Sequence, residues 1–151
     1  MKRDEILGKV TRDLLAITPL IRRNIQRKLV KTAFSQIDQN ISLPHLDILK
    51  TLQMEGTQHI AEIGERLQIQ KPQMTHLIDR LEALGLVSRQ PEPNDRRITN
   101  VMLTDHGRQI IDEFDTVILG TVEEKLSHLN DRELEEISAS LQKIGNLFEQ
   151  F

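Results

Sequence analysis

The segment from Ile60 to Gly107 places two short helical patterns directly before a strand–loop–strand pattern. The apolar spacing predicts helices over Ile60–Leu67 and Lys71–Leu84, separated by only a short turn. Val87–Gln90 and Ile98–Leu103 then have the character of short strands, and the prolines in the loop between them exclude a helix. Two helices joined by a tight turn and followed by a hairpin predict a winged helix-turn-helix.

The second of these helices has one apolar and one polar face. Its apolar positions, which are expected to be buried, are Met74, Leu77, Ile78, Leu81 and Leu84. The polar face, apart from Asp79, carries side chains that can bind base edges or phosphates. The candidate DNA-binding residues here, with the helix start included, are Gln70, Lys71, Gln73, Thr75, His76 and Arg80. Any surface helix has a polar face, so it is the position before a hairpin that favours DNA binding.

The predicted hairpin loop supplies an independent signal. Asp95 stands two residues before Arg97, with Arg96 between them, so its carboxylate can hold the Arg97 guanidinium in one orientation. An oriented arginine at a loop tip suits the narrow, strongly negative minor groove of DNA. A surface ion pair at a hairpin turn is the alternative interpretation and, taken alone, the commoner case. Asp95, Arg96 and Arg97 join the candidate DNA-binding residues.

Longer helical patterns flank this motif. From about Asp4 to Phe34 apolar residues recur every three or four positions, over a length that suggests packing against a partner helix. A polar, turn-like stretch follows at residues 35–42. After the hairpin, Thr104 is expected to cap one helix and Asn130, with Glu133 in a capping box, another. The last helix has an apolar seam typical of a coiled-coil-like contact, at Leu134, Ile137, Leu141, Ile144, Phe148 and Phe151.

These patterns together predict a mainly α fold with a small β-hairpin wing. Residues 1–34 and 108–151 are expected to form a helical dimerisation region, and residues 35–107 a winged helix-turn-helix DNA-binding region. The winged helix-turn-helix is thus flanked by N- and C-terminal dimerisation helices.

The net charge of −3 has the wrong sign for a protein that binds phosphate through a broadly basic surface. The acidity is concentrated at the C-terminal end, where eleven Asp and Glu but only four Lys and Arg follow Arg97. The first predicted helix is instead basic on one side. This basic face either is simply solvated or contacts phosphates that flank the binding site. Affinity for DNA would therefore depend on a few placed groups.

Five segments carry a recognisable pattern: Ile63–Leu67, Thr75–Glu82, Gly85–Arg89, Asn94–Arg97 and Leu103–Gly107. Together they resemble the MarR family of multiple-antibiotic-resistance-type regulators, and the spaced signature D-x-R followed by L-T-x-x-G is complete. The resemblance implies a homodimer, joined through the N-terminal helix and the two helices after the hairpin, that binds double-stranded DNA at a pseudo-palindromic operator. It also implies repression that is relieved when a small lipophilic or phenolic effector binds between the dimerisation and DNA-binding regions.

The same resemblance assigns roles to individual residues. It implies that Arg97 is the wing-tip arginine and Asp95 its acidic partner. It places Thr75, His76 and Arg80 at base-contacting positions of the recognition helix. Because the chain has no cysteine, the oxidant sensing found in one branch of the family is excluded.

Other functions are weighed against this one. A winged helix used only for protein interaction, without specific DNA binding, is the main rival, and it predicts that Arg80 and Arg97 are dispensable. An enzyme is not expected, since the chain has no glycine-rich phosphate loop, no nucleophile elbow and no cysteine. Its five histidines lack metal-ligand spacing, so neither a metal nor another cofactor is expected.

The sequence also bears on the effector site and on the cellular location of the protein. Ile21, Ile25 and Phe114 could line an effector cleft but are equally well explained as core residues, so the effector-binding residues stay unknown. No apolar run approaches the length that a bilayer requires, and the N-terminus lacks the features of a signal peptide. A cytoplasmic protein without membrane contact is therefore expected.

Overall fold

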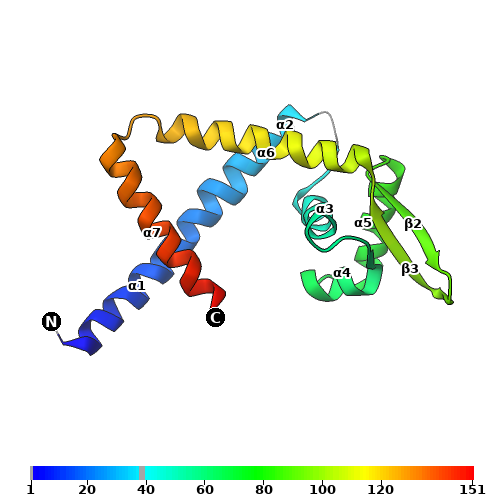
Figure 1. Ribbon diagram of the computed structural model, residues 1–151, viewed down its shortest axis with the longest axis horizontal. Coiled ribbons are helices and arrows are strands. Elements are labelled where there is room, and N and C mark those ends of the chain that lie inside the picture. The colour runs from blue at the N-terminus through cyan, green and yellow to red at the C-terminus, as the bar shows by residue number, and fades with distance from the viewer. Residues whose placement is uncertain (1, 38–39) are drawn as a thin grey trace. The chain divides into compact units, whose positions relative to one another are not determined.

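The computed structural model describes residues 2–37 and 40–151, and it is mainly helical with a small three-stranded antiparallel sheet (Figure 1). The chain forms two compact units, Met1–Ile118 and Leu119–Phe151. The turn expected at residues 35–42 includes residues 38 and 39, which lie outside the described residues. Among the described residues, no helix is both long and apolar enough to cross a membrane.

The predicted N-terminal helix is present but is not a regular α-helix throughout. It comprises α1 (Arg3–Ile21), the π-helical segment η1 (Arg22–Leu29) and α2 (Val30–Gln36), which follow one another without a break. Pro19 has no N–H to donate and so interrupts the regular hydrogen-bond ladder. Asn24 Nδ2 then donates to the Leu20 carbonyl at 2.9 Å, which an α-helical N–H would otherwise use. The apolar periodicity predicted the helix but not this change of winding.

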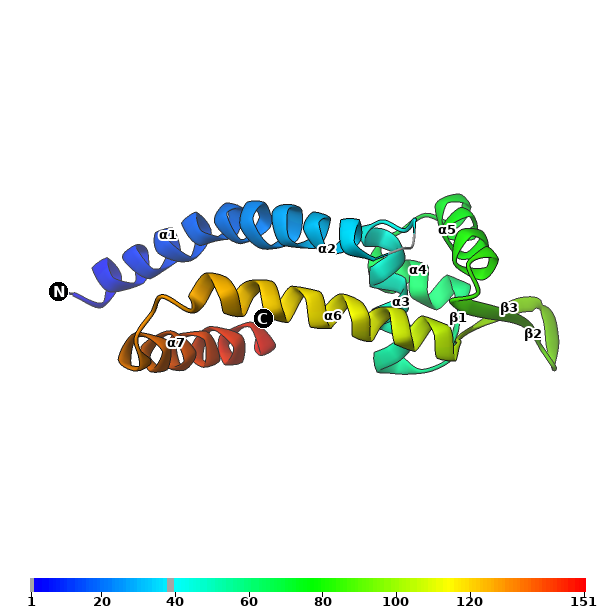
Figure 2. The same cartoon turned by 90° about the horizontal axis from the view of Figure 1, so that it is seen from above.

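The two-helix motif and its hairpin form as predicted. The helices α3 (Leu43–Glu55), α4 (Ile60–Leu67) and α5 (Lys71–Ala83) precede the strands β2 (Val87–Glu92) and β3 (Asp95–Leu103). Figure 2 shows that this hairpin projects past α4 and α5 and does not lie flat on them. The predicted fold class, a mainly α chain with a winged helix-turn-helix, is confirmed.

The sheet corrects the sequence-based prediction at two places. Gln58–His59, directly before the helix predicted over Ile60–Leu67, forms a short strand, β1, that was not predicted; it pairs with β3, so the strand order is β1-β3-β2. A two-residue strand is too short to show a period of two. The loop expected from Pro91 to Arg97 is also shorter, because β2 extends to Glu92 and β3 begins at Asp95. Pro91 is tolerated in β2 because that strand lies at an edge of the sheet.

The hydrophobic core surrounds the buried face of α5. Met74, Leu77, Ile78 and Leu81 of this helix are almost fully buried, as their spacing predicts, whereas Leu84, just past the helix end, is only partly buried. They belong to one cluster with side chains of α3, α4, β3 and α6 (Asp105–Leu126), which include Ile48, Leu49, Ile63, Val101 and Ile111. The core therefore fixes the rotation of α5, and its polar face points away from the protein.

Two of the three apolar residues considered for an effector cleft do not lie in this core. Phe114 is buried and packs against Phe34, with ring centroids 4.9 Å apart. Ile21 and Ile25 are instead 45% and 46% exposed. The interpretation as core residues is thus correct for Phe114 alone.

The unit Leu119–Phe151 contains the end of α6 and the helix α7 (Asp131–Glu149). The predicted capping box is present, since the Glu133 N–H donates to Asn130 Oδ1 at 2.9 Å and the Asn130 N–H donates to Glu133 Oε2 at 3.0 Å. No residue of α7 is buried, and its apolar seam is exposed at Leu134, Ile137, Leu141 and Phe148.

The L-T-x-x-G signature lies where α5, β2 and α6 meet. Thr104 donates its hydroxyl proton to the Gly85 carbonyl at 2.6 Å and accepts the Gly107 N–H at 3.0 Å. Its own N–H donates to the Leu86 carbonyl at 3.1 Å. A Cβ on Gly107 would overlap that same Leu86 oxygen and the Leu103 side chain. Only glycine allows this close approach.

The substitution Gly107→Ala should therefore lower the free energy of unfolding by about 1–3 kcal/mol, as overpacking in a rigid site does. Urea denaturation, monitored by circular dichroism, measures this change in the free energy of unfolding. Gly120→Ala on the same helix is the matched control, because nothing lies within 4 Å of a Cβ there. Equal unfolding free energies for the two variants would contradict this role for Gly107.

Candidate nucleic-acid interface

A fixed turn connects α4 to α5. Gln68 adopts the left-handed conformation with φ 56°, and the Ile69 N–H donates to the Gly64 carbonyl at 2.8 Å. Gln70 is extended and precedes the first residue of α5, and Pro72 occupies the first helical turn, where its missing N–H costs nothing. The N-terminus of α5 is thereby presented to solvent.

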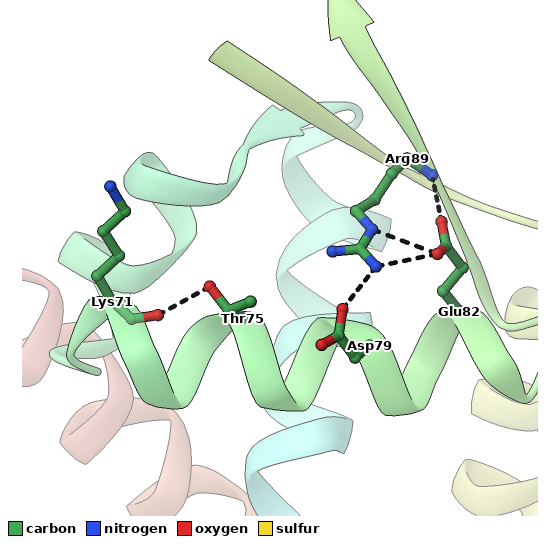
Figure 3. Close-up of polar contacts among 5 residues, drawn as sticks. All are labelled: Lys71, Thr75, Asp79, Glu82 and Arg89. Carbon is green, nitrogen blue, oxygen red and sulfur yellow. Dashed lines mark hydrogen bonds and ion pairs between the residues drawn. The ribbon is translucent and has the colours of Figure 1, made fainter. Parts of the chain in front are cut away.

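The predicted residues of α5 lie on its outward side. Gln70, Lys71, Gln73, Thr75 and His76 are all exposed, and Arg80 is half-buried. The Thr75 hydroxyl donates to the Lys71 carbonyl at 3.1 Å, as Figure 3 shows, and keeps its lone pairs for another donor. Arg80 Nε donates to the Asn40 carbonyl at 3.4 Å, which directs its side chain toward the residues before α3. These groups are spread over the solvent-accessible half of α5, and their role in DNA binding stays a prediction.

The pair expected at the hairpin tip forms. Arg97 donates from Nε to Asp95 Oδ1 and from Nη2 to Asp95 Oδ2, each at 3.0 Å, and its backbone N–H donates to Oδ1 at 3.1 Å. These bonds lower the pKa of Asp95 and raise that of Arg97, so both groups remain charged. The Arg97 side chain is nevertheless 90% exposed, and Arg96 beside it is also exposed. One carboxylate thus orients a guanidinium that projects into solvent.

A cavity of about 470 Å³ lies between α4, α5 and the hairpin. Its lining includes the cationic side chains of Lys71 from α5 and of Arg89 and Arg97 from the strands, together with the Thr75 hydroxyl. Ile60, Ile69 and Met74 contribute apolar surface. Glu65 also lines this concavity, and Arg89 is bonded to carboxylates of α5, so Lys71 and the exposed Arg97 are the cations that it offers to a polyanion in contact with both helix and hairpin.

Arg89 is a site residue that the sequence pattern does not single out as functional. Figure 3 shows its side chain directed at the carboxylates of Asp79 and Glu82, both on α5. Its partners are seven and ten residues away in sequence. The one signal available in the sequence was Asp79 itself, an acidic residue on an otherwise DNA-compatible face.

His45, at the start of α3, is a second residue of this kind. Its Nδ1 accepts the Ser42 N–H at 3.0 Å. Burial lowers the pKa of His45, and the nearby charges of Arg80 and His76 lower it further. The neutral ring is thus the form that the folded protein favours, next to two of the predicted DNA-binding side chains.

A metal centre does not emerge from the geometry. Within residues 2–37 and 40–151, no group of three or more His, Asp or Glu side chains is arranged to hold a metal ion.

The comparisons with known proteins agree with this geometry. Residues 41–99 match the MarR family model. The chain is 27% identical to the HTH-type transcriptional regulator MhqR of Bacillus subtilis (strain 168) over 104 residues, which cover 69% of this chain and 72% of the relative. It is also 27% identical to the HTH-type transcriptional repressor MdtR of the same organism, over 69% of this chain and 63% of the relative.

Solved structures extend the likeness to nearly the whole chain. The transcriptional regulator BldR from Sulfolobus solfataricus superposes with a TM-score of 0.65 at 27% identity, covering 97% of this chain and 99% of that one. The similarity therefore includes the long helices outside the residues that the family model matches.

The environment of His45 predicts how stability depends on pH. Because the pKa of His45 is lowered on folding, the unfolded chain takes up a proton near the usual value of 6.5 that the folded chain does not. The free energy of unfolding should therefore fall as the pH drops through 6.5 toward the lower pKa of the folded state. His45→Gln should weaken this dependence, because a glutamine at this position can still accept the Ser42 N–H in a capping box.

Urea denaturation at pH values on either side of 6.5 measures the effect. His128→Gln is the matched control, since His128 is exposed and lies outside this cluster. An unchanged pH dependence in His45→Gln would show that His45 does not titrate on unfolding.

Proposed function

We propose that the chain, which matches the MarR family model over residues 41–99 and resembles the HTH-type transcriptional regulator MhqR, is a transcriptional regulator of this family that binds a pseudo-palindromic operator as a homodimer. The observation that supports the proposal best is that Lys71 of α5 and the exposed Arg97 of the hairpin line one concavity. In a winged helix-turn-helix the second helix of the motif enters the major groove. Arg97, held by Asp95 and exposed, is suited to the adjacent minor groove.

The proposed contacts divide by position. Lys71, Thr75 and His76 near the N-terminal end of α5 are exposed and can bind base edges or phosphates. Gln70, Gln73, Arg80, Asp95 and Arg96 complete the set proposed from the sequence. Since the net charge is −3, most of the affinity should come from these placed groups and not from a general attraction for phosphate.

The homodimer is supported by large apolar side chains that are exposed to solvent in the single chain. No residue of α1 is buried, and four of its large apolar side chains are exposed to solvent: Ile6, Leu7, Val10 and Leu20. The seam of α7 is exposed in the same way. Exposed apolar surface of this extent marks an interface. We therefore propose residues 1–34 and 108–151 as the dimerisation region, with residues 35–107 as the DNA-binding region.

Repression is the mode of action that we propose, since one relative, MdtR, is named a transcriptional repressor. A small aromatic or lipophilic effector that releases the protein from DNA is part of the same proposal, from the family resemblance. A transcriptional regulator acts where the DNA is, so the proposed location is the cytoplasm.

Removal of the exposed guanidinium at the hairpin tip tests the DNA-binding proposal. Arg97→Ala should weaken binding to the operator by roughly 1–3 kcal/mol, the usual value of a good groove contact. Fluorescence anisotropy with duplexes from the DNA upstream of its own gene, against scrambled duplexes, measures this change. Arg132→Ala is the matched control, because Arg132 is 89% exposed and also pairs with a carboxylate, but lies on α7. If both variants bind like the unaltered protein, the protein-interaction alternative is favoured.

The dimer can be tested separately. Sedimentation equilibrium at micromolar concentration should give twice the monomer mass of 17.4 kDa. Leu141→Asp, which places a charge in the exposed seam of α7, should shift the protein toward monomer. Ala139→Asp adds the same charge on the other side of this helix and should leave the mass unchanged. A monomeric unaltered protein would disprove the proposed dimer.

A further inference from the structure

The outer part of the hairpin has no fully buried side chain. Val87 and Val101 at its base are 2% and 0% exposed. Between them, from Ser88 to Asn100, every residue is half-buried or exposed. Apolar burial therefore fixes where the hairpin leaves the protein but not the direction in which it continues. Polar contacts from the outer strands to the rest of the protein can set that direction.

Arg89 makes such contacts, from β2 to α5. Its Nη2 donates to Asp79 Oδ1 and, at 3.0 Å, to Glu82 Oε1, which also accepts from Nε at 3.3 Å. The Arg89 backbone N–H donates to Glu82 Oε2 at 3.2 Å. Figure 3 shows the guanidinium between the two carboxylates, which lie one helical turn apart on the same side of α5. One side chain and one backbone group thus tie the strand to the helix at two points.

The two arginines of the hairpin therefore differ in what they can reach. The Arg89 side chain is 29% exposed and bonds to the helix, whereas the Arg97 side chain is 90% exposed and bonds only within the hairpin tip. The bond from Arg89 lowers the pKa of Glu82, and the Glu82 carboxylate in turn raises the pKa of Arg89. The tie between helix and strand is thus ionised at neutral pH.

We propose that Arg89 is a positioning residue: by bonding to Asp79 and Glu82 it fixes the angle between the hairpin and α5, and so the place that Arg97 reaches relative to that helix. The inference rests on the proposed function, because this angle matters for binding only if helix and hairpin contact the same duplex. It also gives two carboxylates on a helix that faces a polyanion a structural role, since both bond to Arg89, whose charge offsets one of the two negative charges.

A direct contact from Arg89 to a DNA phosphate is the competing role, and the two carboxylates distinguish the roles. The double substitution Asp79→Asn and Glu82→Gln keeps the side-chain shapes and removes two negative charges. If Arg89 binds phosphate, freeing it in this way strengthens binding to every duplex. If Arg89 positions the hairpin, binding to the operator weakens despite the more positive surface, and binding to other DNA does not.

The experiment uses the full-length protein and anisotropy titrations with an operator and a scrambled duplex. For the double variant we expect the ratio of operator to scrambled affinity to fall roughly tenfold, the loss that follows when one good groove contact is misplaced. The control is Glu123→Gln with Glu124→Gln, which changes the net charge equally at two exposed positions on α6. A ratio that stays constant or rises in the Asp79→Asn and Glu82→Gln variant overturns the inference.

The angle itself can be measured without DNA. The chain has no cysteine, so Ala83→Cys on α5 and Asn94→Cys at the hairpin turn give two unique spin-label sites. Dilution with unlabelled protein restricts the dipolar distance measurement to pairs within one chain. We expect one narrow distance distribution, which broadens or shifts in Arg89→Gln and in the carboxamide double variant but not in the control. Unchanged distributions overturn the inference. If the protein has no operator preference, the proposed function fails and these distances still decide the role of Arg89.

Discussion

The hydrogen bonds of Thr104 hold together three elements on which the rest of the DNA-facing surface depends. This residue bonds to the Gly85 and Leu86 carbonyls just after α5, and its hydroxyl accepts the Gly107 N–H at the start of α6. Because Gly85 has a φ of 73°, the chain turns there, α5 ends, and β2 begins two residues later at Val87. The helix, the hairpin and the long helix α6 therefore leave one rigid junction in set directions.

That junction fixes only the base of the hairpin. We infer that ion pairs between side chains set the direction of its outer part relative to α5. Arg89 and Arg97 belong to the same hairpin and both pair with carboxylates, but their partners lie in different places. The partner of Arg97 is two residues away in the same hairpin, so this pair moves with the tip. The partners of Arg89 are on α5, so this bond relates the tip to the helix. One arginine can thus contact DNA while the other determines where that contact is made.

The sequence predicts these features to different depths for physical reasons. The faces of α5 and the cap at Asn130 follow from local spacing, and both are present in the structure. The strand Gln58–His59 and the π-helical winding of Arg22–Leu29 were missed, because neither has a period that apolar residues reveal. Arg89 was missed for another reason: its partners become visible only when β2 is placed beside α5. Asp79 stood out in the sequence as an exception, and the tertiary contact explains it.

The overall charge makes geometry more important than it would be in a basic protein. A protein with a net charge of −3 gains little from counterion release away from its placed cations, so a misplaced arginine is not compensated by a surrounding basic surface. The affinity that these few DNA contacts provide then depends on how rigidly the junction at Thr104 and the bonds from Arg89 to α5 hold them in place. The exposed apolar faces of α1 and α7 add a second constraint, because they are the surfaces proposed to join two protomers. A pseudo-palindromic site is bound well only if the DNA-binding surfaces of both protomers are held at a fixed separation. Specific binding in this protein should therefore depend as much on residues that never touch DNA as on those that do.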